Sequence, residues 1–177
     1  MKQLCMKFMA LLLFPIFSIA QTKLDKKISL LNNKVEINVP KQLSAMTDEM
    51  WKLKYKDFQR PELVLTDDNA EVNLLADYTS QTATSSQIAA YKDFRISNLK
   101  NTRRDVRILN DGIKKVDGKT IGFIKFSSQA SDQGVFNYYF FTVVNGKILL
   151  FTFNCIEKLQ SSWEKVADDM LESIKIK

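Results

Sequence analysis

The chain has 177 residues, room for one domain of ordinary size, with a net charge of +6 and no histidine. Without histidine there is no serine–histidine or cysteine–histidine catalysis and no histidine metal site. Its five glycines are spread singly, so no glycine-rich loop exists to cradle a phosphate. The sequence therefore predicts a protein that is not an enzyme and that uses no cofactor or metal.

The first 20 residues have the pattern of a secretory signal peptide. Lys2 and Lys7 precede an apolar run over residues 8–19, and Ser18-Ile19-Ala20 is a small-x-small cleavage site. The run is short for a membrane span, although an uncleaved anchor remains an alternative. Cleavage after Ala20 predicts a single domain over residues 21–177, periplasmic or extracellular, with no membrane span.

Removal of the leader lowers the net charge to +4 and leaves Cys155 as the only cysteine. No intramolecular disulfide is then possible, and we expect a buried, unreactive thiol. A balance of +4 is too mild to imply nucleic acid.

The domain opens with a predicted hairpin. Val35, Ile37 and Val39 alternate with polar residues, which is typical of a strand with one face in water, near the edge of a sheet. Asn32-Asn33 is a plausible turn before it. Thr47 then predicts the start of a short helix.

On that helix Trp51, Tyr55 and Phe58 share one side if the helix persists, because they lie at i, i+4 and i+7. We expect this side to pack on the sheet. The alternative is a docking surface, which makes Trp51 and Tyr55 candidate partner-binding residues.

A further hairpin is predicted over residues 62–66 and 70–78, around Asp67-Asp68-Asn69. This acidic turn lacks the alternating ligands and the central glycine of an EF-hand loop. We interpret it as a solvated turn.

Thr84 and Gln87 form a capping box for a helix over residues 85–99. Basic residues follow it, at Arg103, Arg104 and Arg107. They are the expected complement of a helix C-terminus, and the alternative is that they bind a protein partner. The aromatic and basic residues do not interleave as in an RNA-binding sheet.

The centre of the chain predicts consecutive strands joined by tight turns. Asp117-Gly118 and Asn145-Gly146 tolerate the positive φ angles of two-residue hairpin turns. The strands on both sides of Asn145-Gly146 carry apolar residues on both faces, so they should be central in their sheet with a layer over each face.

The aromatic residues of this hairpin are expected to be core. The alternative is that one face stays partly open as a pocket for a small apolar ligand. That face includes Phe136, Tyr138, Phe140 and Phe153.

The last helix is predicted by a capping box at Ser161 and Glu164, and it extends to about Ser173 with a clean apolar stripe. The stripe turns Asp168 and Asp169 towards water. This helix and the helix over residues 85–99 supply the two covering layers. The fold class is therefore α+β, an antiparallel sheet of about six or seven strands flanked by helices.

The chain after the leader resembles the PsbP/Mog-like superfamily, which includes the bacterial DcrB-like exported proteins. The resemblance is carried by the opening strand with Pro40, the hairpin at Asp117-Gly118-Lys119, the strand after Asn145-Gly146-Lys147, and the stretch from Trp163 to Lys175. It implies an α/β/α sandwich whose members mostly bind other proteins, and it brings no catalytic residues.

Two function hypotheses follow. The first is a non-catalytic exported protein that binds another protein or a component of the cell envelope. The second is a carrier of a small apolar ligand.

Overall fold

The computed structural model describes residues 22–56, 58–130 and 133–177. It contains a seven-stranded antiparallel sheet of order β3-β4-β5-β9-β8-β7-β6 and a three-stranded sheet of order β1-β2-β10. The strands are β1 (Lys26–Leu30), β2 (Val35–Val39), β3 (Ser44–Ala45), β4 (Leu63–Thr66), β5 (Val72–Thr82), β6 (Arg107–Val116), β7 (Lys119–Gln129), β8 (Gly134–Val144), β9 (Lys147–Ile156) and β10 (Lys175–Ile176). The helices are α1 (Asp48–Tyr55), α2 (Ile88–Thr102) and α3 (Gln160–Glu172).

The two predicted hairpin turns are confirmed. Asn145 and Gly146 have φ angles of 49° and 75°, and Val144 lies opposite Lys147. Asp117 has a φ angle of 48° in the turn between β6 and β7. These turns set the register of β6 with β7 and of β8 with β9, and β8 and β9 lie near the middle of the large sheet.

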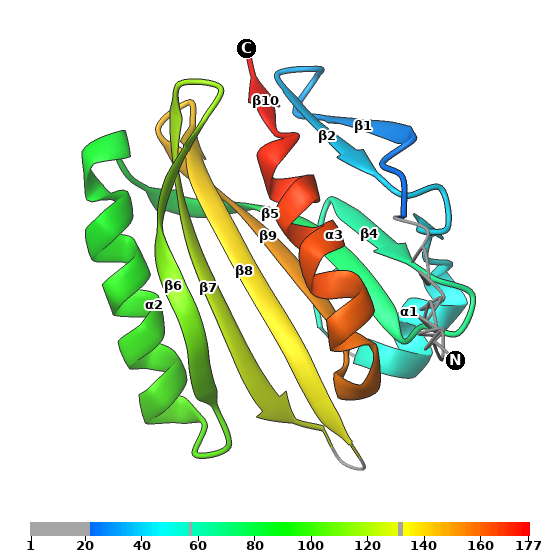
Figure 1. Ribbon diagram of the computed structural model, residues 1–177. Coiled ribbons are helices and arrows are strands. Elements are labelled where there is room, and N and C mark those ends of the chain that lie inside the picture. The colour runs from blue at the N-terminus through cyan, green and yellow to red at the C-terminus, as the bar shows by residue number, and fades with distance from the viewer. Residues whose placement is uncertain (1–21, 57, 131–132) are drawn as a thin grey trace, which may run out of the picture.

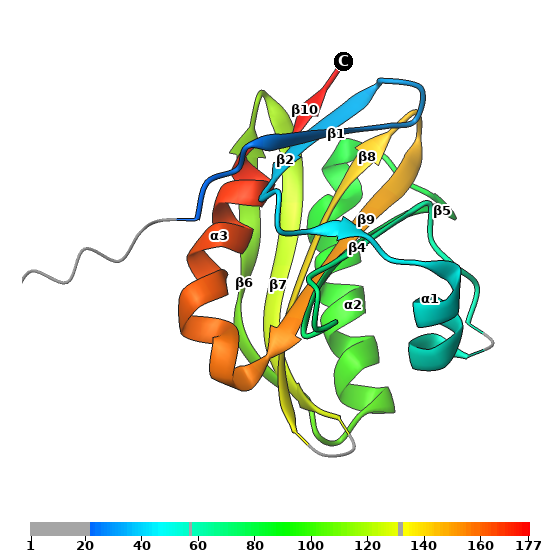
Figure 2. The same ribbon diagram turned by 90° about the vertical axis from the view of Figure 1, so that its right-hand side faces the viewer.

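Helices lie on both faces of the large sheet, as the apolar central strands require (Figure 1). One face packs against α3 and the small sheet in the main hydrophobic core. The opposite face packs against α2 in a second cluster and against α1 in a third. Figure 2 shows α3 and α1 on opposite sides of the sheet. The predicted α+β sandwich is therefore confirmed.

The predicted strand with Val35, Ile37 and Val39 on its buried face is confirmed, but its predicted position near a sheet edge is wrong. Their strand, β2, is the central strand of the small sheet, between β1 and β10, and all three side chains are fully buried. Lys175 and Ile176 of β10 pair with Glu36 and Val35. The far end of the chain thus pairs with the edge of β2 that the prediction left free, at Val35 and Glu36.

The predicted capping box at Ser161 and Glu164 is also wrong. A 3₁₀ turn over Glu157–Leu159 leads directly into α3, so the helical run begins four residues before Ser161. No side chain caps α3. Glu164 instead accepts hydrogen bonds from Gln160 and Lys125. By contrast, both hydrogen bonds of the predicted capping box at Thr84 and Gln87 are present.

Cys155 lies in the main core and is fully buried. Burial raises the pKa of its thiol to about 12, so the reactive thiolate is scarce near neutral pH. We expect iodoacetamide to leave Cys155 of a Cys5→Ser variant unmodified in the native protein and to alkylate it in 6 M guanidinium chloride, as measured by mass spectrometry. Alkylation at equal rates in both conditions would contradict the buried position.

The predicted signal peptide lies outside the described residues. Within the residues that the structure describes, no helix is both long enough and apolar enough to cross a membrane.

Candidate functional site

A groove of about 640 Å³ lies beside the second half of β5. This volume is in the range of about 300–1,000 Å³ that is typical of ligand sites. We call it the β5 groove and define it by its lining residues. These are residues 59–62 ahead of β4, residues 77–81 of β5, Tyr91 and Arg95 of α2, and Leu150 of β9.

The groove exists because β4 is much shorter than β5. The two strands pair from Leu63 opposite Ala76 to Thr66 opposite Asn73, whereas β5 runs on to Thr82. Pro61 lies just ahead of β4, where it has no N–H group to continue the ladder. The chain before β4 therefore leaves the sheet, and a gap opens beside β5.

Arg60 fixes the segment that diverges from the sheet. Its guanidinium donates hydrogen bonds to the carbonyl oxygens of Met46 and Thr47 and forms an ion pair with Asp48 at 3.2 Å. It also lies over the Trp51 ring, 5.6 Å from the centroid. Because these contacts occupy Arg60, its role is to hold this wall of the groove in place.

Arg95 and Tyr91 form the opposite wall and lie close to one another. Arg95 Nε and the Tyr91 hydroxyl are buried and have no well-formed hydrogen bond, although the two side chains are near enough for Arg95 to act on Tyr91 through a side-chain hydrogen bond. The guanidinium of Arg95 lies over the Tyr139 ring at 5.4 Å, and the Tyr91 ring meets Phe141 edge-on at 4.8 Å. Buried polar atoms normally make well-formed hydrogen bonds, so this pair is unusual for a purely structural element.

The electrostatic environment couples these groups to one another. Burial raises the pKa of Tyr91, while the Arg95 charge and a side-chain hydrogen bond from Arg95 act in the opposite direction and Asp77 adds to the rise. The Tyr91 hydroxyl therefore stays protonated near neutral pH and is available as a donor. Asp77 and Glu62 are exposed carboxylates of the same groove.

Sequence reasoning missed Arg95. A signal was present, because Ile88, Arg95 and Leu99 lie at i, i+7 and i+11, on one side of the helix. Ile88 and Leu99 are buried. An arginine at a core-facing position of a helix is uncommon and marks a position where the helix faces something other than the core.

The predicted basic residues lie at and just after the end of α2. Arg103 is held by Asp105, with Nη2–Oδ2 at 2.6 Å, and by the carbonyl oxygen of Gln129 at 3.1 Å. Arg104 and Arg107 are exposed. This surface is separate from the β5 groove, whose lining includes none of the three arginines.

The structure places Trp51 and Tyr55 on α1, capped by the predicted Thr47. Trp51 is buried against Met46 and Val64, and its ring stacks on Tyr55 at 4.3 Å. The helix ends at Tyr55, so Phe58 does not share their side and is 76% exposed. Trp51 therefore acts as packing for α1, beneath the surface that a partner would contact.

The four aromatic residues of the carrier hypothesis are all fully buried. Phe140 stacks on Phe151 at 5.1 Å, Tyr138 meets Phe140 at 5.4 Å, and Phe136 meets Phe153 at 6.4 Å. They belong to the main core with residues of α3 and β2. This face of the sheet is thus filled by side chains.

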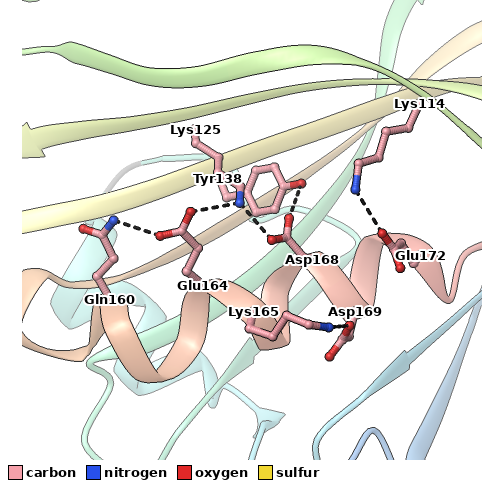
Figure 3. Close-up of polar contacts among 9 residues, drawn as sticks. All are labelled: Lys114, Lys125, Tyr138, Gln160, Glu164, Lys165, Asp168, Asp169 and Glu172. Atoms are coloured by element: carbon pink, nitrogen blue, oxygen red, sulfur yellow. Dashed lines mark hydrogen bonds and ion pairs between the residues drawn. The ribbon is translucent and has the colours of Figure 1, made fainter.

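A buried lysine joins α3 to the same face (Figure 3). Lys125 Nζ of β7 lies 2.9 Å from Glu164 Oε1 and 2.9 Å from Asp168 Oδ2. The Tyr138 hydroxyl donates to the other oxygen of Asp168 at 2.9 Å. The expectation that Asp168 faces water is therefore wrong, because it points towards the sheet.

This cluster has the pKa pattern of a structural ion pair. Burial raises the pKa of Tyr138, and the neighbouring Asp168 charge adds to the rise. Burial would also raise the pKa of Glu164, but hydrogen bonds from Gln160 and Lys125 outweigh it and keep that pKa below the ordinary value. None of the buried side-chain nitrogen and oxygen atoms of this cluster lacks a hydrogen-bond partner, and its bonds tie α3 to β7 and β8.

No protein-family model matches the chain, and no curated protein matches it in sequence. Solved structures do match. The cyanobacterial PsbP protein of Synechocystis sp. PCC 6803 is 13% identical with a TM-score of 0.58, covering 86% of this chain and 92% of its own. The chain has a PsbP-like fold.

Two further PsbP-like neighbours come from other bacteria. LpqN of Mycobacterium tuberculosis, described as involved in cell envelope biogenesis, is 10% identical with a TM-score of 0.55, over 85% of this chain and 89% of LpqN. PA94 of Pseudomonas aeruginosa, of unknown function, is 9% identical with a TM-score of 0.54, over 85% of this chain and 97% of PA94. At these identities the PsbP-like likeness concerns the fold alone.

Proposed function

We propose that this is an exported, non-catalytic protein that binds another protein of the cell envelope through the β5 groove. The observation that carries the proposal is the groove itself, where a sheet edge lies beside Tyr91 and Arg95, whose buried hydroxyl and Nε have no well-formed hydrogen bond. Buried polar atoms are normally paired. A partner that supplies the missing acceptors explains why this wall is built from a tyrosine and an arginine.

Exposed aromatic rings near the groove favour a protein as the partner. Phe58 is 76% exposed and precedes the lining residue Gln59. Phe94 is 56% exposed and lies three residues after Tyr91, on the neighbouring flank of α2. Aromatic residues are enriched at protein interfaces, so two exposed rings that directly precede lining residues in the sequence, Gln59 and Arg95, support a protein as the partner.

Export is supported by the leader pattern of residues 1–20, and the description of LpqN as a protein of envelope biogenesis is consistent with it. The lack of histidine supports a role without catalysis. The carrier alternative receives no such support, because its four aromatic residues are core.

The proposal is tested by site-specific photocrosslinking in cells that produce the full chain. A photoreactive residue is placed at Glu62 or Gln81 in the groove, at Arg104 in the basic surface, and at Lys119, the first residue of β7, as a matched exposed control. We expect a discrete adduct with one envelope protein from the two groove positions only, identified by mass spectrometry.

Two results would overturn this assignment. Adducts from Arg104 but not from the groove would move the binding surface to Arg103, Arg104 and Arg107. Equal adducts from the groove and from Lys119 would show that the groove makes no specific contact.

A further inference from the structure

Among the described residues, no strand pairs with the edge of β5 that faces the groove beyond Ala76. In the described part of the chain, β4 pairs with β5 only as far as Ala76, and β5 continues from Asp77 to Thr82. Continuing the register by two residues would place Pro61 opposite Tyr78. Because proline has no N–H group, it offers no donor to the Tyr78 carbonyl at that position.

The orientation of the β5 backbone shows which groups face the open side. The carbonyl oxygen of Val72 accepts from Asp67 N on the β4 side, whereas that of Glu71 accepts from Ile156 N on the β9 side. Neighbouring residues of a strand direct their N–H and C=O groups to alternate sides. The even-numbered residues up to Tyr78 therefore face β4, and the N–H and C=O groups of Tyr78 point into the gap.

Beyond Tyr78 the pairing of β5 with β9 shifts, since Tyr78 lies opposite Leu149 but Thr82 lies opposite Lys147. A bulge of this kind bends a strand and is common at functional sheet edges. The unpaired stretch of β5 is therefore short, because the pairing with β4 limits it on one side and the bulge limits it on the other. This is room for a few residues of an extended chain rather than for a long strand.

The charge of Arg95 indicates which kind of side chain the bound segment would carry. No carboxylate among the described residues forms an ion pair with Arg95, whose guanidinium lies over the Tyr139 ring and acts on Tyr91 through its charge and a side-chain hydrogen bond. A half-buried guanidinium normally has an anionic partner. Side chains of an added strand alternate between the two faces of the sheet, so one residue of the strand would project towards Arg95 on α2.

We propose that the β5 groove takes an extended peptide segment of a partner protein, which adds to β5 beside Tyr78 and places an acidic side chain on Arg95 and Tyr91. Main-chain hydrogen bonds to the sheet edge supply affinity, and the carboxylate supplies selectivity. The exposed Asp77 and Glu62 favour a basic residue elsewhere in the same segment. This inference rests on the proposed function, since it names what the groove recognises.

The test uses the protein purified from cells that express the full sequence. A library of random ten-residue segments, flanked on both sides by constant sequence so that no free terminus is offered, is selected by display. We expect enriched segments to contain Asp or Glu at one fixed position. Replacing that residue by its amide, or Arg95→Gln in the protein, should weaken binding about tenfold or more, whereas Arg104→Gln should not change it.

Two further measurements separate strand addition from simple charge attraction. Methylating the backbone nitrogens of the best peptide one at a time should weaken binding at every second residue, because only alternate N–H groups face β5. An Arg95→Glu variant should lose the original peptide and bind one in which the acidic residue is replaced by lysine. Unchanged thermal unfolding of each variant shows that its fold is intact.

Several outcomes would overturn the inference. These are a selection without enriched segments, binders that ignore Arg95→Gln, a methylation pattern without the two-residue period, and binders that need a free C-terminal carboxylate. A photocrosslink from Gln81 to the first 21 residues of the same chain would also overturn it.

If the crosslinks in cells succeed but the selection fails, the proposed function is retained and only the binding of an extended peptide is wrong. If the selection succeeds but no envelope protein is crosslinked, the proposed function is wrong.

Discussion

Replacing Phe140 by alanine should lower the free energy of unfolding by about 3–5 kcal/mol, the cost of emptying a large site in a packed core. Phe140 is fully buried, stacks on Phe151 and meets Tyr138. Its site is enclosed by the two central strands and by α3, so neighbouring side chains have little freedom to fill the space. Urea unfolding monitored by circular dichroism measures the change.

The matched control is Phe58→Ala. This side chain has the same size but is 76% exposed, so its removal should change stability by less than about 0.5 kcal/mol. If Phe140→Ala were as mild as this control, the face of β8 towards α3 would have to be open, and the carrier hypothesis would return.

Replacing Lys125 by methionine should cost about 3 kcal/mol, measured in the same way. Removal of one partner from a buried ion pair leaves the other charges without compensation. Here two carboxylates lose their shared cation. We expect the low end of the usual range of about 3–5 kcal/mol, because the side chains of Asp168 and Glu164 are 26% and 37% exposed and water partly replaces the ammonium group.

Lys165→Met is the control for Lys125. Lys165 pairs with Asp169 on the outer side of α3, one turn along the helix, and its side chain is 69% exposed. A pair of this kind contributes about 0.5 kcal/mol or less. Equal losses for the two variants would show that the Lys125 cluster is solvated and does not hold α3.

The pH dependence of stability gives this prediction a second measure. The folded protein holds the pKa of Glu164 below its ordinary value of 4.5. The stabilisation is therefore complete above pH 4.5 and is lost as the pH falls through the folded-state pKa. In Lys125→Met the pKa of Glu164 loses the lysine contribution, so the fall in stability below pH 4.5 should be shallower than in the unchanged protein.

Much of this structure follows from local patterns in the sequence. Asn145-Gly146 and Asp117-Gly118 specify tight turns because few residues accept positive φ angles, and these turns set the register of the central strands. Alternation and helical spacing identify the buried side chains, including Cys155 and Phe140. These patterns identify buried residues because burial depends on which face of a helix or strand a residue occupies. The prediction does not require knowing which element packs against that face.

The partners of these elements were decided only by the tertiary structure. β2 pairs with β10 across about 140 positions of the chain, and Lys125 pairs with two carboxylates of a helix about 40 residues away. The divergence of β4 at Pro61 becomes a groove only because α2 brings Tyr91 and Arg95 above β5. Periodicity in the sequence indicates which side of an element is buried. Which segment packs against that side depends on the packing of the whole chain. The β5 groove is formed by four separate segments, so it could be found only from the tertiary structure.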